Sequence, residues 1–368
     1  MKIIHCADIH LDSPFTVSDP AEAEKRRTSL RSAFSSLVLY AKTSGCELFI
    51  ISGDLFDDES ITKDTSLMLC KEMSSISGCR FVIAPGNHDP YTQSSPYKLI
   101  KWPDNVYIFT KPTLEFFDFP EINTRVYGYA FTGDTMTQDP LTGFCAEDKS
   151  KINILAAHCD LDKTLSYYAP VTKYDLAECG CEYAALGHIH TGTPVEKTGG
   201  TLYAYSGCIE GRDFGETGYK GAIVGEVSKS AAELRHVRFS AKRYEKTECD
   251  VSGASCLSDC AQTISEKCAS YGEDTLLRIV LTGITSTSFF ADNEQIRKIV
   301  TRPCYVEIKD DTLAMLDAKN LKEDKSLAGE FFRSLEPKLL SQDPEEKKTA
   351  SLALKYGLRA INKMEIKL

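Results

Sequence analysis

The sequence predicts an α/β protein: a four-layer αββα sandwich of two mixed sheets, followed by a small α+β domain and C-terminal helices. The first ninety residues alternate apolar strands with amphipathic helices, which is typical of a βαβαβ unit with parallel strands. Short apolar segments at even intervals between residues 152 and 239 predict a second sheet, which we expect to be mostly antiparallel. Near residue 240 the pattern changes to two strands around a helix, which indicates a separate small domain.

The first part of the chain contains three predicted strands, at residues 3–7, 48–51 and 81–84. A helix is expected over residues 20–44, because apolar residues recur there at helical spacing and Gly45 follows as a stop signal. A second helix is expected over residues 62–77. This order of elements places the strands side by side and parallel.

The middle part is predicted to be rich in strands. Residues 91–125 contain four prolines and are expected to form loops with short strands, and residues 132–150 a long surface loop. The expected strands lie at residues 126–130, 152–157, 183–186, 194–195, 202–205, 222–227 and 234–239.

We expect three domains: residues 1–240, an α+β domain of residues 241–317 and a helical segment of residues 318–368. In the second, strands at 276–281 and 304–308 accompany helices at 255–271 and 292–300. In the third, one helix carries an apolar stripe of Leu327, Phe331, Phe332 and Leu335, and a second follows at 345–362. The stripe either packs on its own domain or binds a partner.

Composition limits the class of protein. With 53 acidic and 43 basic residues, the net charge of −10 counts against nucleic acid as a partner, although bound cations neutralise carboxylates locally. No apolar run approaches the roughly 20 residues that cross a bilayer, and no secretory signal opens the chain, so we expect no membrane partner, a cytoplasmic location and reduced cysteines. Cys256, Cys260 and Cys268 leave a zinc site open as an alternative, but helix-like surroundings without a nearby histidine disfavour it.

Residues that can bind a metal follow the ends of predicted strands in five places. These clusters are Asp8-Ile9-His10, Gly53-Asp54, Gly86-Asn87-His88-Asp89, His158 and Gly187-His188-Ile189-His190. They contain five of the seven histidines of the chain. A polar turn or a structural histidine explains any one cluster alone. Because open α/β sheets bind ligands at the carboxyl ends of their strands, the whole set indicates one site.

The donor atoms of these clusters are histidine nitrogens, carboxylate oxygens and one amide oxygen. This mixed set suits Mn, Fe, Zn, Co or Ni and disfavours soft thiolate chemistry. Seven ligands with one shared carboxylate suffice for two cations about 3.5–4 Å apart, which hold a phosphoryl oxygen and lower the pKa of bound water towards about 7. In the pairs Asp8-x-His10 and His188-x-His190, residues two apart in an extended segment point the same way and can reach one site.

In this order the five clusters resemble the motifs of calcineurin-like metallophosphoesterases, over about the first 210 residues. The second motif extends to Asp57, as Gly53-Asp54-x-x-Asp57. Residues 7–15 and 205–218 are similar to the DNA-repair exonuclease branch of the SbcD and YhaO type. Asp12-Ser13-Pro14 replaces the glycine-containing continuation common in SbcD, which favours the YhaO-like group.

The resemblance implies a calcineurin-like fold and a role for each residue of the site. The implied ligands are Asp8, His10 and His190 for a first metal, Asn87, His158 and His188 for a second, and Asp54 as the bridge. His88 would be the catalytic histidine, which stabilises developing charge or protonates the leaving 3′-oxygen. Asp89 would orient His88, and Asp57 would support the ligands from a second layer.

The resemblance also implies partners and cofactors. It implies a DNA phosphodiester as substrate, two divalent ions that are most often manganese, and a capping role for the small domain. The terminal helices would bind the coiled-coil base of an SMC-like ATPase, and a homodimer is one oligomeric state to test. Arg212 could contact a phosphate, but Glu210, Asp213 and Glu216 make a structural ion pair an equal alternative.

Three functions remain open from the sequence. The first is a manganese-dependent DNA exonuclease or endonuclease that acts in DNA repair by a two-metal mechanism. The second is a phosphoesterase for nucleotides, small phosphodiesters or phosphoproteins, which the negative net charge favours. The third is an inactive scaffold that docks an ATPase, which would have no physical need of seven ligands and His88.

Overall fold

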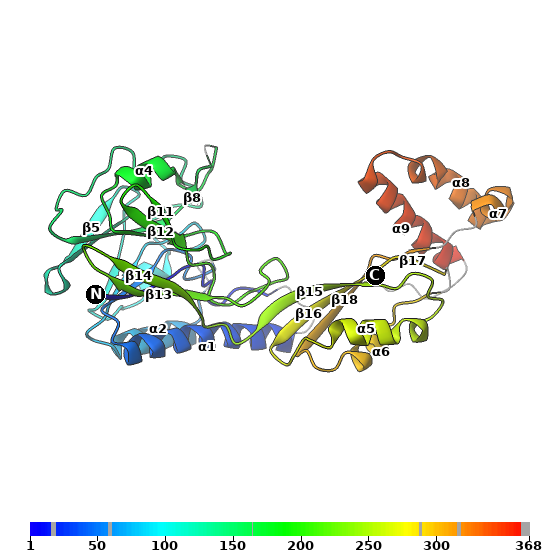
Figure 1. Ribbon diagram of the computed structural model, residues 1–368, viewed down its shortest axis with the longest axis horizontal. Helices are drawn as coiled ribbons and strands as arrows, with labels where there is room; N and C mark the ends of the chain where they lie inside the picture. Colours follow the sequence, from blue (N-terminus) through cyan, green and yellow to red (C-terminus); the bar gives the residue numbers. More distant parts are fainter. Residues whose placement is uncertain (16–19, 58–60, 164, 287–288, 315–317, 362–368) are drawn as a thin grey trace. The chain divides into compact units, whose positions relative to one another are not determined.

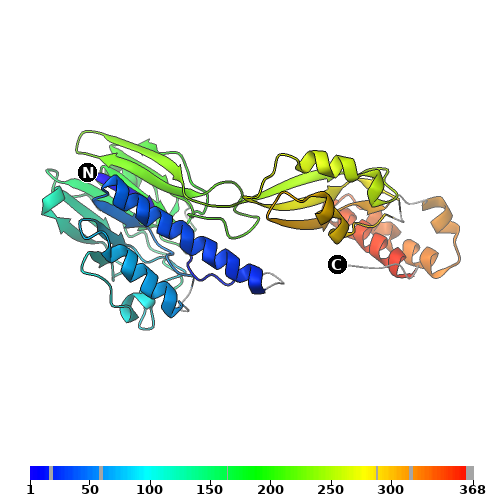
Figure 2. The same cartoon turned by 90° about the horizontal axis from the view of Figure 1, so that it is seen from below.

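The computed structural model describes residues 1–15, 20–57, 61–163, 165–286, 289–314 and 318–361. Contacts divide the chain into two compact units, Met1–Arg243 and the residues from Tyr244 onward. Figures 1 and 2 show the helices and strands of each unit from two directions.

The first sheet of the first unit contains six strands, four of them parallel. Its core follows the predicted alternation, since β1, β2, β3 and β4 pair in this order and in parallel. At the other side of β1, β13 and β14 add an antiparallel edge. In sheet order the bounds are β14 (Ala232–Arg238), β13 (Gly221–Val227), β1 (Lys2–Cys6), β2 (Leu48–Ile51), β3 (Arg80–Ile83) and β4 (Val106–Ile108).

The second sheet also contains six strands, and here one expectation is wrong. The middle of the chain does not form a mostly antiparallel sheet: the four central strands are parallel, only the two edge strands are antiparallel, and β13 and β14 join the first sheet. The long connections between these strands leave room for crossovers, which parallel pairing requires. The continuous burial of β7 and β10 is the pattern of strands covered on both faces. In sheet order the bounds are β11 (Glu196–Thr198), β12 (Thr201–Tyr205), β10 (Tyr183–Gly187), β7 (Ile152–His158), β6 (Thr124–Gly128) and β5 (Glu115–Phe119).

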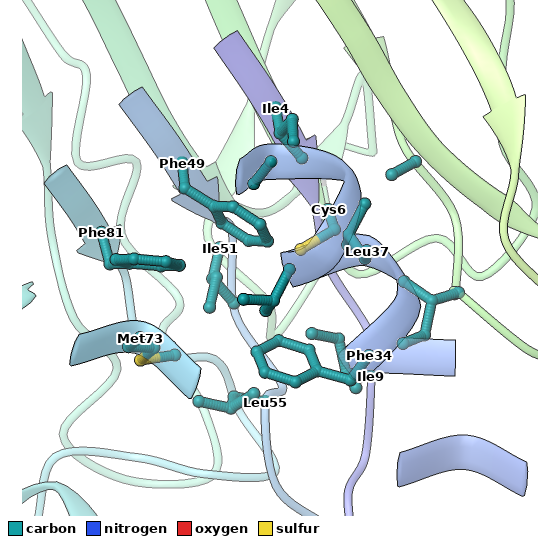
Figure 3. Packing of buried hydrophobic residues seen from close by; sticks show 14 of the residues in the cluster. Ile4, Cys6, Ile9, Phe34, Leu37, Phe49, Ile51, Leu55, Met73 and Phe81 are labelled. Carbon is teal, nitrogen blue, oxygen red and sulfur yellow. The ribbon is translucent and has the colours of Figure 1, made fainter. Parts of the chain in front are cut away.

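Helices cover the outer face of the first sheet. The expected helices are present as α1 (Pro20–Ser44) and α2 (Lys63–Ser74). Figure 3 shows Phe34 and Leu37 of α1 against Phe49 and Phe81 of the strands, and all four side chains are fully buried. Burying one such side chain stabilises the fold by about 1.5–3 kcal/mol, so this layer holds β1, β2 and β3 firmly in place.

The remaining layers complete the predicted αββα sandwich. A second core lies between the sheets, where Ile50 and Val82 of the first sheet belong to one cluster with Ile154 and Ala185 of the second. Outside the second sheet lie α4 (Lys173–Glu178) and the predicted long loop of residues 132–150, from which Leu141 and Ala146 are buried. Short elements complete the unit: α3 (Pro96–Leu99), η1 (Pro120–Ile122), β8 (Asp160–Leu161) and β9 (Pro170–Val171).

The second unit begins as an α+β fold. Its main sheet has the order β15 (Arg243–Asp250), β16 (Thr275–Thr282) and β18 (Tyr305–Asp310), and the accompanying elements are η2 (Leu257–Asp259), α5 (Ala261–Cys268), β17 (Ile284–Thr285), α6 (Asn293–Ile299) and β19 (Leu313–Ala314). Cys260 and Cys268 are buried in its apolar core, whereas Cys256 is exposed. Among the described residues, no group of three close metal ligands includes a cysteine, so the zinc alternative gains no support.

Three helices end the described chain: α7 (Ala318–Glu323), α8 (Leu327–Leu339) and α9 (Pro344–Ile361). Most of the predicted apolar stripe packs within this unit, because Phe332 is buried against α9 and an added Cβ at Gly357 of α9 would overlap the Phe331 ring. The ammonium group of Lys355, itself 4% exposed, lies 2.8 Å from both carboxylate oxygens of Asp310 and thereby ties α9 to β18. Within the described part of the chain, no helix combines the length and apolar character that crossing a bilayer requires.

Candidate dimetal site

The five predicted clusters meet because their strands end at one edge of the two sheets. Cys6, Ile51 and Ile83 are register partners at the ends of β1, β2 and β3, and His158 is paired with Gly187 at the ends of β7 and β10. The clusters therefore leave neighbouring strands at the same level, as expected for the ligand edge of parallel sheets.

One half of the site is a compact group of four side chains. Ligand atoms of Asp8, His10, Asp54 and His190 all lie within 4.8 Å of one another. The Nε2 atoms of His10 and His190 are 3.4 Å apart, and Nε2 of His10 is 3.6 Å from Oδ2 of Asp54. Two carboxylates and two imidazoles that converge in this way can bind one divalent cation.

The other half shares Asp54. Nε2 of His158 lies 3.4 Å from Oδ2 of Asp54 and 2.9 Å from the amide oxygen of Asn87. The His188 ring stands edge-on to that of His158, with 5.2 Å between centroids, and the His188 amide donates to the Asp8 carboxylate at 3.0 Å. The seven predicted ligands thus lie together, with Asp54 between the two groups.

Three glycines allow this close approach. A Cβ at Gly53, where φ is +93°, would lie 2.2 Å from the ring nitrogen Nδ1 of His158. A Cβ at Gly86 would lie 2.2 Å from the Asp54 carboxylate, and one at Gly187 would lie 1.8 Å from the carbonyl oxygen of Ser52. The glycines in the motifs therefore make room for ligands and for contact between strands.

Asp57 connects the ligands to His88. One of its carboxylate oxygens accepts from Nδ1 of His10 at 3.1 Å and lies 3.2 Å from Nδ1 of His88. Its other oxygen accepts from the Ser13 hydroxyl at 2.6 Å. The His88 side chain is 50% exposed, so its ring can meet a substrate. The hydrogen bond to Asp57 raises the pKa of His88, which favours the protonated form that a general acid requires.

The expected role of Asp89 is corrected. Its carboxylate does not orient His88; it accepts from the backbone amides of Gly86, Asp54, Leu55 and Phe56 and from the Tyr97 hydroxyl. Burial and the nearby Asp54 charge raise the pKa of Asp89 to about 7. A short side chain pointing inward cannot reach the exposed ring of the preceding residue. The carboxylate beside the His88 ring is that of Asp57, whereas Asp89 holds the two loops together.

Three residues near the ligands complete the surroundings. Glu216 accepts from Nδ1 of His190 at 2.5 Å, and Asp160 lies 3.5 Å from Nε2 of His188. Arg212 lies 3.5 Å from both Asp57 and Glu216. Of the three carboxylates that the sequence offered as its ion-pair partners, Glu216 is therefore one that it contacts, and Asp57 is a further one. The spacing His158-x-Asp160 could have indicated from the sequence that Asp160 lies near the site. For Glu216, the available indication was its position within the family-like segment of residues 205–218.

The electrostatics of the site fit divalent cations. Asp8 and Asp54 are both buried, and two carboxylates close together without water strongly favour a bound cation. Burial raises the pKa of Asp8, whereas for Asp54 the effect of burial is outweighed by His158 and His10 and the pKa is lowered. Burial and the neighbouring His158 lower the pKa of His188 to about 4, so its imidazole is neutral, as a metal ligand must be.

This fold and this site define a metal-dependent phosphoesterase. Residues 1–192 match the calcineurin-like phosphoesterase family, and the chain belongs to that family. The fold class expected from the resemblance is thereby confirmed, and the Asp and His cluster suits the two divalent metals of such an enzyme.

Individual relatives are about a quarter identical to the chain over the aligned residues. It is 26% identical over 297 residues to the uncharacterized metallophosphoesterase YhaO of Bacillus subtilis, covering 77% of this chain and 72% of that protein. It is 25% identical over 215 residues to the DNA double-strand break repair protein Mre11 of Sulfurisphaera tokodaii, covering 56% of this chain and only 53% of that protein. Among solved structures, TT1561 of Thermus thermophilus matches with a TM-score of 0.39 at 12% identity, covering 65% of this chain and 98% of that one.

Proposed function

We propose that the protein is a manganese-dependent DNA exonuclease or endonuclease that hydrolyses phosphodiesters in DNA repair. The observation that carries this proposal is that the seven predicted ligand side chains converge around Asp54, with the half-exposed His88 beside them. The similarity to proteins named DNA double-strand break repair protein Mre11 supports DNA as the substrate.

The proposed roles follow the two halves of the site. Asp8, His10 and His190 would hold the first cation, Asn87, His158 and His188 would hold the second, and Asp54 would be shared by both. Two divalent cations held there would supply positive charge for the phosphoryl oxygens and a water whose pKa is lowered towards about 7. Donation from Nδ1 of His10 to Asp57 and from Nδ1 of His190 to Glu216 directs the Nε2 atoms inward.

The residues outside the ligand set shape the reaction. His88, held by Asp57 through Nδ1, donates a proton to the leaving oxygen or stabilises its negative charge. Arg212 adds positive charge beside Asp57 and Glu216 and helps to hold these two carboxylates. Together these residues orient three histidines through their Nδ1 atoms.

The alternatives predict different substrates. A phosphoesterase for nucleotides or phosphoproteins would explain the negative net charge of −10. An inactive scaffold would serve to bind an SMC-like ATPase through the terminal helices, a partner that we also propose for the nuclease. The ligand geometry around Asp54 speaks against the scaffold.

One assay separates these functions. The full chain is incubated with manganese and one of four substrates: linear duplex DNA, single-stranded DNA, a nucleoside monophosphate or bis-p-nitrophenyl phosphate. The nuclease hypothesis expects DNA cleavage that EDTA abolishes and that Asp54→Asn lacks, whereas Asp118→Asn, which alters an exposed carboxylate paired with Arg125 and Lys151, retains it. Hydrolysis of the small esters alone would support the second function, and no hydrolysis the third.

A further inference from the structure

A short segment of the first unit has a charge opposite to that of the chain as a whole. Residues 235–243 contain Arg235, Arg238, Lys242 and Arg243 and no carboxylate, in a protein with 53 acidic and 43 basic residues. A basic segment in an acidic protein creates a local positive potential that attracts polyanions.

Two of these cations lie on one exposed aromatic ring. The guanidinium carbon of Arg238 is 3.4 Å from the ring centroid of Tyr219, and that of Arg243 is 4.7 Å from it. Tyr219 is 40% exposed. Nε of Arg238 donates to the carbonyl oxygen of Ser240 at 3.0 Å, which fixes the plane of the guanidinium. Rigid, flat cations of this kind suit phosphate groups, and aromatic rings beside them suit bases.

The segment that carries Tyr219 also contacts the metal site. On its inner side, Glu216 accepts from the ring of His190, and the ammonium of Lys220 lies 3.5 Å from the carbonyl oxygen of the same histidine. On its outer side, Tyr219 is exposed beside Arg238 and Arg243. The backbone bonds Phe239 N to Lys220 O at 3.1 Å and Ser240 N to Lys220 O at 3.2 Å hold the basic segment against it. The cation-bearing surface is therefore one chain segment away from a ligand of the candidate site.

We propose that Tyr219, Arg238, Lys242 and Arg243 form a surface that binds the phosphodiester backbone of a nucleic acid whose scissile phosphate lies at the metal site. The inference rests on the proposed nuclease function and adds the residues that hold the strand away from the point of cleavage. Phosphates of one strand follow each other at about 3.4 Å along a helix axis, so a strand bound at the metal site carries further phosphates on either side of the cleaved one, and these are the groups that we propose the surface binds.

The test compares charge removal on this surface with charge removal elsewhere in the same basic segment. Arg238→Gln/Arg243→Gln is measured against Arg235→Gln, which removes an exposed charge from β14 but none from the Tyr219 ring, and against Arg238→Lys/Arg243→Lys, which keeps both charges. For each variant, kcat/KM is determined for duplex DNA and for bis-p-nitrophenyl phosphate over a series of KCl concentrations. Thermal melting verifies that each variant is folded.

We expect kcat/KM for DNA to fall by about tenfold in the Gln double variant at moderate salt. The slope of log(kcat/KM) against log[KCl] should become shallower by about 2, one for each lost phosphate contact. The Gln double variant should hydrolyse bis-p-nitrophenyl phosphate as the wild type does. The Lys double variant should keep the wild-type salt slope, and kcat/KM of Arg235→Gln for DNA should stay within about twofold of the wild-type value. If the wild type cleaves DNA and the Gln double variant shows the same kcat/KM and salt slope, the proposed binding surface is wrong, while the nuclease function still stands. Hydrolysis of the small ester without any action on DNA by the wild type overturns the nuclease function, and the surface with it.

Discussion

Asp57→Asn tests whether one carboxylate controls both a metal ligand and the catalytic histidine. One oxygen of Asp57 faces Nδ1 of His10 at 3.1 Å and Nδ1 of His88 at 3.2 Å, and the other faces the Ser13 hydroxyl at 2.6 Å and Arg212 at 3.5 Å. An asparagine has only one acceptor oxygen. If that oxygen faces the histidines, its NH₂ meets the donor-only guanidinium of Arg212; if it is turned around, both histidines lose their acceptor.

The magnitude follows from these contacts. A hydrogen bond to a charged group contributes about 1.5–3 kcal/mol, and changes that misorient metal-bound histidines cost about 10–100-fold in affinity or activity. Because each tenfold corresponds to about 1.36 kcal/mol, we expect kcat/KM for bis-p-nitrophenyl phosphate to fall by about 10–100-fold and the affinity for manganese to fall as well.

A double-mutant cycle shows whether the effect acts through His88. At saturating manganese, which offsets the weaker hold on His10, Asp57→Asn/His88→Ala should be no slower than His88→Ala alone, because the other histidine that Asp57 orients is already absent. Asp118→Asn is the matched control on an exposed ion pair with Arg125. The proposed link between Asp57 and His88 would be refuted if Asp57→Asn kept the wild-type kcat/KM. It would also be refuted if the loss in the double variant equalled the product of the losses in the two single variants.

Three further substitutions test the site. His88→Ala should retain two metals by elemental analysis and lose about 10²-fold or more in turnover, the range of a lost general acid; wild-type turnover would remove that role. Asp54→Ala should lose metal from both halves, and a variant that still contains two ions would contradict the bridge. Gly53→Ala should displace the His158 ring, since a Cβ would lie 2.2 Å from its Nδ1, and should lower the bound metal from two ions towards one; unchanged metal content would show that the ring can move without loss of binding.

The convergence of the seven predicted ligand side chains could be predicted because the sequence indicates the strands and their order. Apolar runs predict the strands, and a polar cluster after each run predicts the shared edge of the sheet, so that Asp54 and His158 meet although they are far apart in the chain. Whether the strands of the second sheet pair in parallel or antiparallel could not be predicted from the sequence. Short strands at even spacing occur in antiparallel sheets as well as in parallel sheets with irregular connections, and the continuous apolar runs at β7 and β10 were the signs of parallel strands.

The contacts of the supporting carboxylates were harder to predict, because they depend on the direction in which each side chain points rather than on its position along the chain. Asp57 and Asp89 both follow a ligand motif, yet one turns towards His88 and the other towards the backbone amides of the Asp54 loop. Nothing in the spacing distinguishes these orientations, which are fixed by the packing of Tyr97 and Ser13 against the two loops.

The backbone of the site is strained at four of the predicted ligands. Asp8, His10, Asp54 and His188 all have positive φ, at 51°, 50°, 53° and 101°. A non-glycine residue in this region costs about 1–3 kcal/mol, and the imidazole of histidine gives no folding advantage there. Glycine would relieve the strain at each position and remove a donor atom. Such strain persists only where the surrounding structure holds it, and here the buried strands β1, β2 and β10 supply that support. Four strained donors distributed over the two halves of one site are therefore best explained by a requirement for bound cations, and this favours the enzyme over the inactive scaffold.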